Sequence, residues 1–177
     1  NAVRTAEAFD PAKVELSVFH LRNDGPLRER YEKLGVPLTH VPIPNLRSIR
    51  TLVQGIHLAK LLRAGKFEVV HSHDIYCNIF AVPFARILTS CKVIASRRWW
   101  YEAPRPELVA LNRVCNRFAH RVLGNSSGVV RLLKDAEGVR SERVVMIPNF
   151  LSPAAFEFAD EEAKRSQRRL WGVPEGA

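Results

Sequence analysis

Residues 67 to 96 read FEVVHSHDIYCNIFAVPFARILTSCKVIAS, and they hold two short apolar runs on either side of a longer apolar segment. The runs Phe67 to Ser72 and Lys92 to Ser96 lack polar alternation, which is typical of strands buried on both faces. Between them, Tyr76 to Leu88 has the length and composition of a helix. A strand, a helix and a strand in this order predict a right-handed β-α-β unit with parallel strands.

The same alternation continues on both sides of this unit. Before it, we expect helices at 2 to 9, at Pro26 to Leu34 and from Asn45 or Ser48 to Gly65, and strands at Val14 to Leu21 and Val36 to Ile43. After it, we expect helices around Leu111 to Phe118 and from Ser126 or Ser127 to Gly138, and strands at Arg121 to Gly124 and Arg143 to Ile147. This order predicts the doubly wound α/β class, a Rossmann-like, mainly parallel sheet with helices on both faces.

Apolar spacing predicts which side of the helix ending at Gly65 is buried. Ile49, Leu52, Val53 and Ile56 keep the i, i+3, i+4, i+7 spacing of one helical face. We expect this stripe to lie on the sheet.

Length and composition limit the class of protein. The 177 residues are 46% hydrophobic and 25% charged, which fits one globular domain and excludes a disordered or collagen-like chain. Arg86 interrupts the best apolar run, so no membrane span is expected and the chain should be soluble or peripheral. Cys77, Cys91 and Cys115 are odd in number and form no C-x-x-C pair, which favours a reduced, cytoplasmic location without a zinc site.

The charge is strongly basic. Lys and Arg number 27 and Asp and Glu number 18, so the net charge is +9. Between Arg86 and Arg131 there are nine basic residues and only Glu102 and Glu107 as acidic ones. Such a segment favours a phosphate ester, an acidic lipid surface or nucleic acid as partner, or it forms solvated helix faces alone.

The strongest candidate site follows the strand that ends at Ser72. His71 and His73 are two residues apart, so their side chains share one face of that strand, and Asp74 begins the turn that follows. Imidazole here suits a sugar hydroxyl or a phosphate. A metal is disfavoured because Tyr76 stands where an H-x-H-x-D-H motif needs its last histidine. The structural alternative is that His71 packs into the sheet while Asp74 caps the helix.

Three further candidates follow other strands, where ligands bind in such sheets. Arg97 and Arg98 open an aromatic, proline-flanked loop that suits an anionic head group, or they pair with Glu102 or Glu107. Asn125 and Ser126 lie in GNSSG at a helix start, and Asn149 follows the last strand. The chain holds neither G-x-G-x-x-G nor G-x-x-x-x-G-K-[ST], so the sequence offers no nicotinamide fingerprint or P-loop and no cofactor is expected.

An ordered set of motifs resembles one enzyme family. FEVVHSHD, VIASRR, RVLGNSSGVVRLL-x5-GV and RVVMIPNF-x5-F occur in that order over nearly the whole chain. They resemble the N-terminal, acceptor-side domain of retaining GT-B glycosyltransferases of glycosyltransferase family 4. The resemblance implies a Rossmann-like acceptor domain at 1–156, and a linker helix at 157–177 that leads to a donor-binding domain.

The resemblance also implies a reaction. Members of the family move a sugar from a nucleotide sugar to an acceptor with retention, in a cleft between two domains, and the nucleotide sugar is a substrate rather than a cofactor. By resemblance, His73 faces the reacting sugar. Arg97 and Arg98 line the acceptor side, and Asn125 with Ser126 face the cleft. The basic 86–131 segment points to a lipid-linked or otherwise anionic acceptor and to peripheral contact with the cytoplasmic face of an acidic membrane.

This sequence departs from the family pattern in three places. The first strand and its glycine-rich turn precede Asn1, so a central strand of the sheet is expected to be missing. The chain ends near the start of the donor domain, so we expect it to be inactive alone. The usual N-G-V-D is replaced by Asn149-Phe150-Leu151-Ser152.

Two other functions remain open on sequence grounds. One is a non-catalytic Rossmann-like domain that binds nucleic acid or another polyanion through its basic face, although the sequence contains no nucleic-acid-binding signature. The other is an epimerase on the same two-domain plan, whose distinguishing residues would lie in the donor domain.

Overall fold

The computed structural model describes residues 2–23, 25, 27–98, 106–151 and 160–174. Its strands are β1 (Val18–His20), β2 (Leu38–His40), β3 (Val69–Ser72), β4 (Lys92–Arg97), β5 (Arg121–Gly124) and β6 (Val144–Met146). Its helices are α1 (Ala2–Ala8), α2 (Arg28–Lys33), α3 (Ile49–Ala64), α4 (Ile75–Leu88), α5 (Pro106–Phe118), α6 (Ser127–Arg131) and α7 (Glu161–Leu170). A π-helical turn, η1 (Leu132–Ala136), continues α6, and a 3-10 turn, η2 (Ser141–Arg143), precedes β6.

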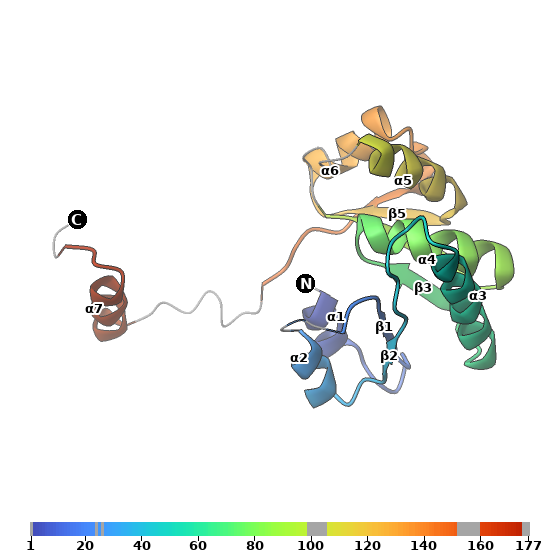
Figure 1. Cartoon of the computed structure of the whole chain (residues 1–177). Helices are drawn as coiled ribbons and strands as arrows, with labels where there is room; N and C mark the ends of the chain where they lie inside the picture. The colour runs from blue at the N-terminus through green and yellow to red at the C-terminus, as the bar shows by residue number, and fades with distance from the viewer. Residues whose placement is uncertain (1, 24, 26, 99–105, 152–159, 175–177) are drawn as a thin grey trace.

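All strand pairs in the described residues are parallel, and strands alternate with helices as predicted (Figure 1). The order β3-β4-β5-β6 forms a four-stranded sheet, while β1 and β2 form a separate pair. The doubly wound α/β class is therefore confirmed. The split agrees with the predicted gap, because no described strand joins β1 to β3.

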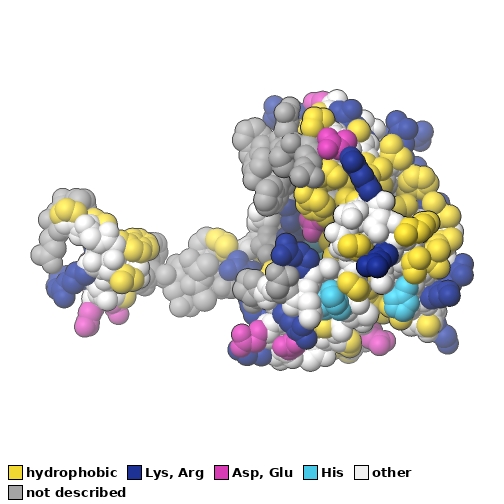
Figure 2. All heavy atoms as spheres, in the orientation of Figure 1, with side chains coloured by type: hydrophobic (Ala, Val, Ile, Leu, Met, Phe, Trp, Pro, Cys, Tyr) yellow, Lys and Arg dark blue, Asp and Glu magenta, His cyan; other side chains and the backbone are white. Residues whose placement is uncertain are grey.

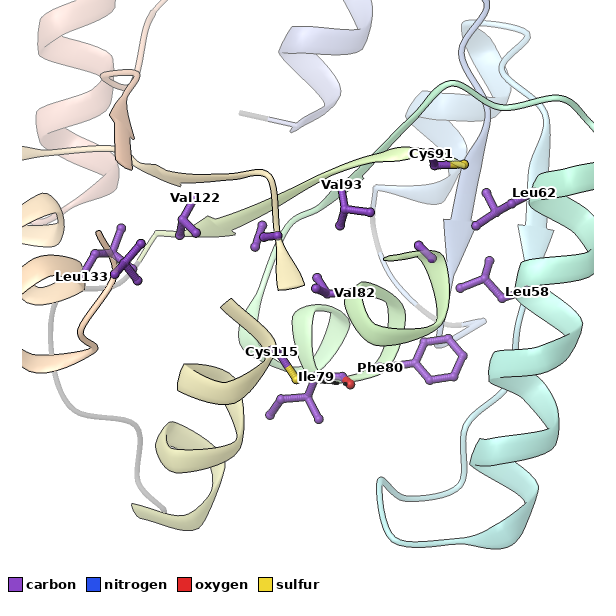
Figure 3. Packing of buried hydrophobic residues seen from close by; sticks show 14 of the residues in the cluster. Leu58, Leu62, Ile79, Phe80, Val82, Cys91, Val93, Cys115, Val122 and Leu133 are labelled. Atoms are coloured by element: carbon purple, nitrogen blue, oxygen red, sulfur yellow. Dashed lines mark hydrogen bonds between the residues drawn. The ribbon is translucent and has the colours of Figure 1, made fainter. Parts of the chain in front are cut away.

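One hydrophobic core serves both sheets. Val82, Val93 and Val122 from α4, β4 and β5 are fully buried and belong to one cluster (Figure 3). Phe19 of β1 packs on this core and meets Phe67 edge to face, with ring centroids 5.6 Å apart. Burying side chains of this size stabilises the fold by about 1.5–3 kcal/mol each. Within the described residues, side-chain packing joins the two sheets, and no hydrogen-bonded ladder does.

The predicted orientation of α3 is wrong. Ile49, Leu52, Val53 and Ile56 are exposed, and the helix instead buries its opposite face, composed of Thr51, Gly55, Leu58, Ala59 and Leu62. Gly55 explains the choice, because a Cβ at this position would overlap the ring of Phe84 on α4. A side chain at position 55 would force the Phe84 ring to move. Both faces of α3 are apolar, so periodicity alone does not select the closer-packing one.

The expectation that the central strands are buried on both faces holds for one of them. In β4, every residue after Lys92 is buried or half-buried, but in β3 both Val69 and His71 are exposed. The difference follows from position, since β4 has a strand on each side whereas β3 ends the four-stranded sheet. The predicted strand Val14 to Leu21 is also shorter, at three residues.

The helix ends follow their predicted caps. The Ser48 hydroxyl accepts from the backbone N–H of Arg50, so Ser48 rather than Asn45 caps α3. Ser126 rather than Ser127 caps α6. Gly35 follows Leu34, the C-cap of α2, and has φ +67°, as a C′ glycine requires. Pro26 lies outside the described residues.

Helix α7 lies apart from the sheets (Figure 1), and none of its residues is buried. It falls within the predicted linker segment 157–177, although the boundary at 156 lies outside the described residues. No helix in the described part of the chain has the length and hydropathy needed to span a bilayer.

Candidate functional site

The candidate residues gather at the carboxyl ends of four neighbouring strands. His73, Arg98 and Asn125 each directly follow β3, β4 and β5, and Asn149 comes three residues after β6. Because the strands are parallel and ordered β3-β4-β5-β6, these ends lie along one edge of the sheet. This edge is where open α/β sheets bind ligands.

Strand alternation decides which side chains meet at this edge. On β3, His71 and His73 point to the same face, as predicted, and their ring centroids are 4.1 Å apart. On β4, Ser96 and Arg98 continue that face. The His71 Nε2 atom lies 2.6 Å from the Ser96 Oγ atom, so the two strands form one cluster.

The contact between His73 and Arg98 fixes the state of the imidazole. An Arg98 Nη2 atom lies 3.1 Å from His73 Nδ1. A guanidinium only donates hydrogen bonds, so Nδ1 must accept and carries no proton. His73 is therefore neutral with its proton on Nε2. That N–H is a donor suited to a hydroxyl or a phosphate oxygen.

Both histidines have lowered pKa values. Desolvation, then the neighbouring His71 and Arg98, lowers the pKa of His73 to about 3. Desolvation and Arg98 lower the pKa of His71 to about 4, even though part of its surface remains exposed at the sheet edge. Both rings are neutral at physiological pH. Such weak bases serve as hydrogen-bonding groups rather than as proton acceptors.

The structure does not bring Arg97 to this cluster. Its side chain points to the core face of β4, behind Val93 and Ala95, and only 7% of it is exposed. There its Nε lies 3.3 Å from Oε1 of Glu137, which is also buried. Desolvation raises the pKa of Glu137, and the charge of Arg97 opposes that rise.

Three buried asparagines complete this network under the site. Asn112 and Asn116 of α5 each donate to Glu137 Oε2 at 2.9 Å. Asn78 of α4 donates to the Ser96 carbonyl at 3.1 Å and to Asn112 Oδ1 at 3.3 Å. The network therefore ties the end of β4 to α4, to α5 and to the residue after η1. It holds the strand end that carries Arg98.

Asp74 caps α4, as the structural alternative predicted. Its Oδ1 accepts from the Cys77 backbone N–H at 2.8 Å, and its Oδ2 accepts from the Cys77 thiol at 3.2 Å. Burial and the carboxylate raise the pKa of Cys77, so this thiol stays protonated. Asp74 thus sets the start of α4 beside His73.

The second half of the edge is formed by amides. Asn125 Nδ2 donates to Asn149 Oδ1 at 3.3 Å, which joins the ends of β5 and β6. Ser126 faces its own helix, where its hydroxyl accepts from the Val129 backbone N–H at 3.3 Å. The candidates therefore form two groups, one around His73 and Arg98 and one around Asn125 and Asn149.

Sequence reasoning missed two contributors. Tyr31 on α2 lies near enough to Arg98 for the guanidinium charge to lower its pKa, although desolvation dominates and raises it. Nothing in the sequence around Glu137 predicts that it is buried, because it follows a helix and has polar residues nearby. The aromatic part of the Arg97 loop, Trp99 to Tyr101, lies outside the described residues.

Within the described ranges, no group of three or more His, Cys, Asp or Glu side chains is arranged to hold a metal ion. What the edge does offer is a neutral N–H donor, a guanidinium and paired amides. These groups recognise sugar hydroxyls and phosphate oxygens.

Several solved structures superpose on this chain. A glycosyltransferase from Rickettsia africae ESF-5 superposes with a TM-score of 0.69 at 13% identity, covering 91% of this chain and 42% of that one. Anabaena Alr3699/HepE in complex with UDP gives 0.67 at 14% identity, covering 88% and 42%. The same protein in complex with UDP-glucose gives 0.65 at 13%, covering 85% and 40%. This chain thus spans about two fifths of those proteins and resembles one Rossmann-like half of a GT-B fold.

The family model for Glycosyltransferase Family 4 matches residues 2–154, which is most of the chain. No curated protein matches the sequence. The matched residues include β1 to β6 and every candidate site residue. The chain belongs to glycosyltransferase family 4.

Proposed function

We propose that this chain is the acceptor-binding half of a glycosyltransferase that transfers a sugar from a nucleotide sugar to an acceptor with retention. The family and the GT-B fold support a transferase. Complexes of the similar Anabaena protein with UDP and with UDP-glucose support a nucleotide sugar as donor. The acceptor carries a lipid or an anionic group, in keeping with the basic 86–131 segment.

The observation that carries this proposal is the contact between His73 Nδ1 and Arg98. It leaves the Nε2–H of His73 free to donate to a hydroxyl of the reacting sugar. The guanidinium has further N–H donors for phosphate or for an anionic acceptor. Charge that develops on the leaving phosphate is stabilised by fixed donors of this kind.

The low pKa of His73 limits its part in the reaction. A group with a pKa of about 3 is a poor base near neutrality. The acceptor proton therefore passes to the leaving phosphate, and His73 orients the sugar. Asn125 and Asn149 bind further hydroxyls at the neighbouring strand ends.

Two substitutions of His73 test this role in the complete protein. His73→Gln keeps an N–H near the position of Nε2, whereas His73→Asn keeps only an acceptor near Nδ1. We expect sugar transfer from a panel of nucleotide sugars to fall at least about 100-fold in His73→Asn, within the range for a lost transition-state donor, and distinctly less in His73→Gln.

His120→Asn is the matched control. His120 lies at the opposite end of β5, and its Nδ1 accepts from the Val93 N–H at 2.9 Å, which an asparagine oxygen can replace. It should leave transfer unchanged. Equal loss in both His73 variants would contradict donation from Nε2, and an inverted anomeric configuration in the product, read from its NMR coupling constants, would contradict retention.

The proposal also covers where the protein works and whether residues 1–177 are active alone. We propose that it works in the cytoplasm and on the cytoplasmic membrane face, and that residues 1–177 alone do not turn over a donor. Sugar transfer by the purified 177-residue chain would overturn the second statement.

A further inference from the structure

The exposed stripe of α3 is part of an apolar surface that the candidate site does not use. Ile49 and Val53 are 71% and 59% exposed, and Leu52 and Ile56 are also exposed. Pro42 and Pro44 in the preceding loop are exposed as well. We refer to Pro42, Pro44, Ile49, Leu52, Val53 and Ile56 as the α3 face. Figure 2 shows hydrophobic side chains gathered over α3 and α4, with Lys and Arg side chains along the border.

This surface is held in place by the packing of α3. Gly55 lies against Phe84, and Leu58 and Leu62 enter the core, so the helix cannot turn to bury its other side. Large exposed apolar patches on soluble proteins mark interaction surfaces. The α3 face is therefore exposed in the described part of the chain.

Two hollows flank Ile49 on this surface. One, of about 410 Å³, is lined by Pro42, Pro44, Ile49, Arg50, Val53 and Gln54. The other, of about 390 Å³, runs between the start of α3 and α4, with Leu46, Leu52 and Phe84 among its lining residues. Arg50 lines the first and Arg47 the second. Each hollow thus combines an apolar floor with one arginine.

The stretch of sequence that contains the α3 face carries charge of a single sign. From Leu34 to Phe67 there is no Asp or Glu, and there are five basic residues, all exposed, namely Arg47, Arg50, Lys60, Arg63 and Lys66. Lys60 and Arg63 follow Ile56 by four and seven residues, so they continue the same helical face. Along this face, the first two turns are apolar and the next two are cationic.

We propose that the α3 face docks this protein on a bilayer surface that contains anionic lipids. Apolar side chains that protrude from a helix bordered by Lys and Arg enter the boundary between head groups and acyl chains, while the cations bind lipid phosphates. A protein partner would need an acidic surface around an apolar one. An anionic bilayer offers an acidic surface and an apolar interior at any orientation. Residues 34–67 contain no Asp or Glu that would repel its lipid phosphates.

The position of the α3 face suggests what docking on a membrane would achieve for the candidate site. Helix α3 begins after the carboxyl end of β2, so its apolar first turns lie toward the edge of the sheet that carries His73 and Arg98. Docking would bring that edge near the membrane surface, where a lipid-linked acceptor presents its head group. The docking itself does not depend on the proposed sugar transfer, since it involves different side chains.

Vesicle sedimentation of the complete protein tests the proposal without donor or acceptor. The probes are vesicles of phosphatidylcholine alone and vesicles with about one third phosphatidylglycerol, at low salt and at about 0.5 M salt. We expect binding to the anionic vesicles only, weakened by salt. Lys60→Gln/Arg63→Gln should weaken it about 30-fold, from ~1 kcal/mol for each cation near the surface. Ile49→Ser/Val53→Ser should weaken it about tenfold or more through lost apolar insertion.

Matched controls come from other surfaces of the same chain. Leu111→Ser/Val114→Ser removes two exposed apolar side chains from α5, and Arg165→Gln/Arg169→Gln removes two charges from α7. Both should bind anionic vesicles like the unchanged protein. The residues changed in all four double variants are exposed, so circular dichroism should show the same folded spectrum for each variant.

Three results would overturn the proposal. Equal binding to both vesicle types would remove the role of charge. Control variants that weaken binding as much as the α3 variants would place the contact elsewhere. Sedimentation equilibrium that shows a dimer, lost in Ile49→Ser/Val53→Ser and accompanied by no vesicle binding, would make a second copy of the chain the occupant. The docking proposal names the surface for the membrane location proposed above, so these results bear on that location. They do not bear on sugar transfer, which the His73 variants test separately.

Discussion

Arg97 and Arg98 are neighbours in the chain with opposite surroundings. Arg97 lies under the sheet beside Glu137, with 7% of its side chain exposed. Arg98 lies at the open edge, where it donates to His73. One guanidinium is part of the interior, and the other is part of the candidate site.

The difference arises because successive side chains of a strand point to opposite faces of the sheet. Val93, Ala95 and Arg97 share the core face of β4, while Ser96 and Arg98 share the other. A pair of adjacent arginines at a strand end therefore supplies one ligand and one structural residue. The predictions that follow test this assignment through stability and pH.

The largest expected effect is on the buried pair. Glu137→Ala should lower the free energy of unfolding by about 3–5 kcal/mol, because it leaves the Arg97 charge buried without a counterion. Urea denaturation measures this. The double variant Arg97→Met/Glu137→Gln should recover part of the loss, since no charge then stays buried and the amide oxygen still accepts from Asn112 and Asn116. A cost below about 1 kcal/mol for Glu137→Ala would show that Arg97 reaches solvent.

The next effect is a dependence of stability on pH. The pKa of His73 is about 3 in the folded chain and near 6.5 in the unfolded chain. Between these two pH values, His73 is protonated in the unfolded chain but not in the folded chain. Its contribution is present above pH 6.5 and is lost as the pH falls toward 3. From pH 7 to pH 5, His73 should cost about 2 kcal/mol of unfolding free energy.

His73→Gln isolates that contribution, because glutamine does not titrate. Its denaturation midpoint should change less between pH 7 and pH 5 than that of the unchanged protein. Identical pH profiles would mean that His73 is protonated normally and does not accept from Arg98.

A smaller effect on stability tests whether Ser126 caps α6. Ser126→Ala should cost about 1 kcal/mol, because the hydroxyl accepts from the Val129 N–H. Ser127→Ala removes a hydroxyl one residue later, inside α6, and should cost much less. Thermal unfolding of the two variants compares them directly. Equal costs would remove the capping role.

The smallest effect on stability is expected at Arg98. Arg98→Met should change the unfolding free energy by no more than about 0.5 kcal/mol, as for other surface substitutions, while sugar transfer falls. Arg97→Met should do the reverse and destabilise the fold, because it leaves the Glu137 carboxylate without its cation. If both variants were equally unstable, the contrast between the two arginines would fail.

Much of the fold was predictable because its signals are local. The strands FEVVHS and KVIAS, the Gly35 stop and the Ser48 and Ser126 caps all follow from short stretches of sequence. The orientation of α3 was not predictable, because both its faces are apolar. It depends on one long-range contact, between Gly55 and Phe84, that periodicity does not contain.

The candidate site was predictable to the level of the strand end. The placement of His71 and His73 on one face followed from their spacing, and Asp74 as a cap followed from its position before α4. The contributions of Tyr31 and Glu137 arise from packing between distant segments. Their roles need the three-dimensional structure.

The two separate sheets imply unequal local stability. Strand β4 is hydrogen-bonded on both sides, whereas among the described strands β1 and β2 pair with each other alone, over three residues each. In the 177-residue chain, backbone amides in β1 and β2 should therefore exchange with deuterium through a partial opening that costs less than global unfolding. The amides of β4 and β5 should exchange only when the whole domain opens. The N-terminal pair of strands would then behave as its own cooperative unit, held to the rest by Phe19 and the side chains around it.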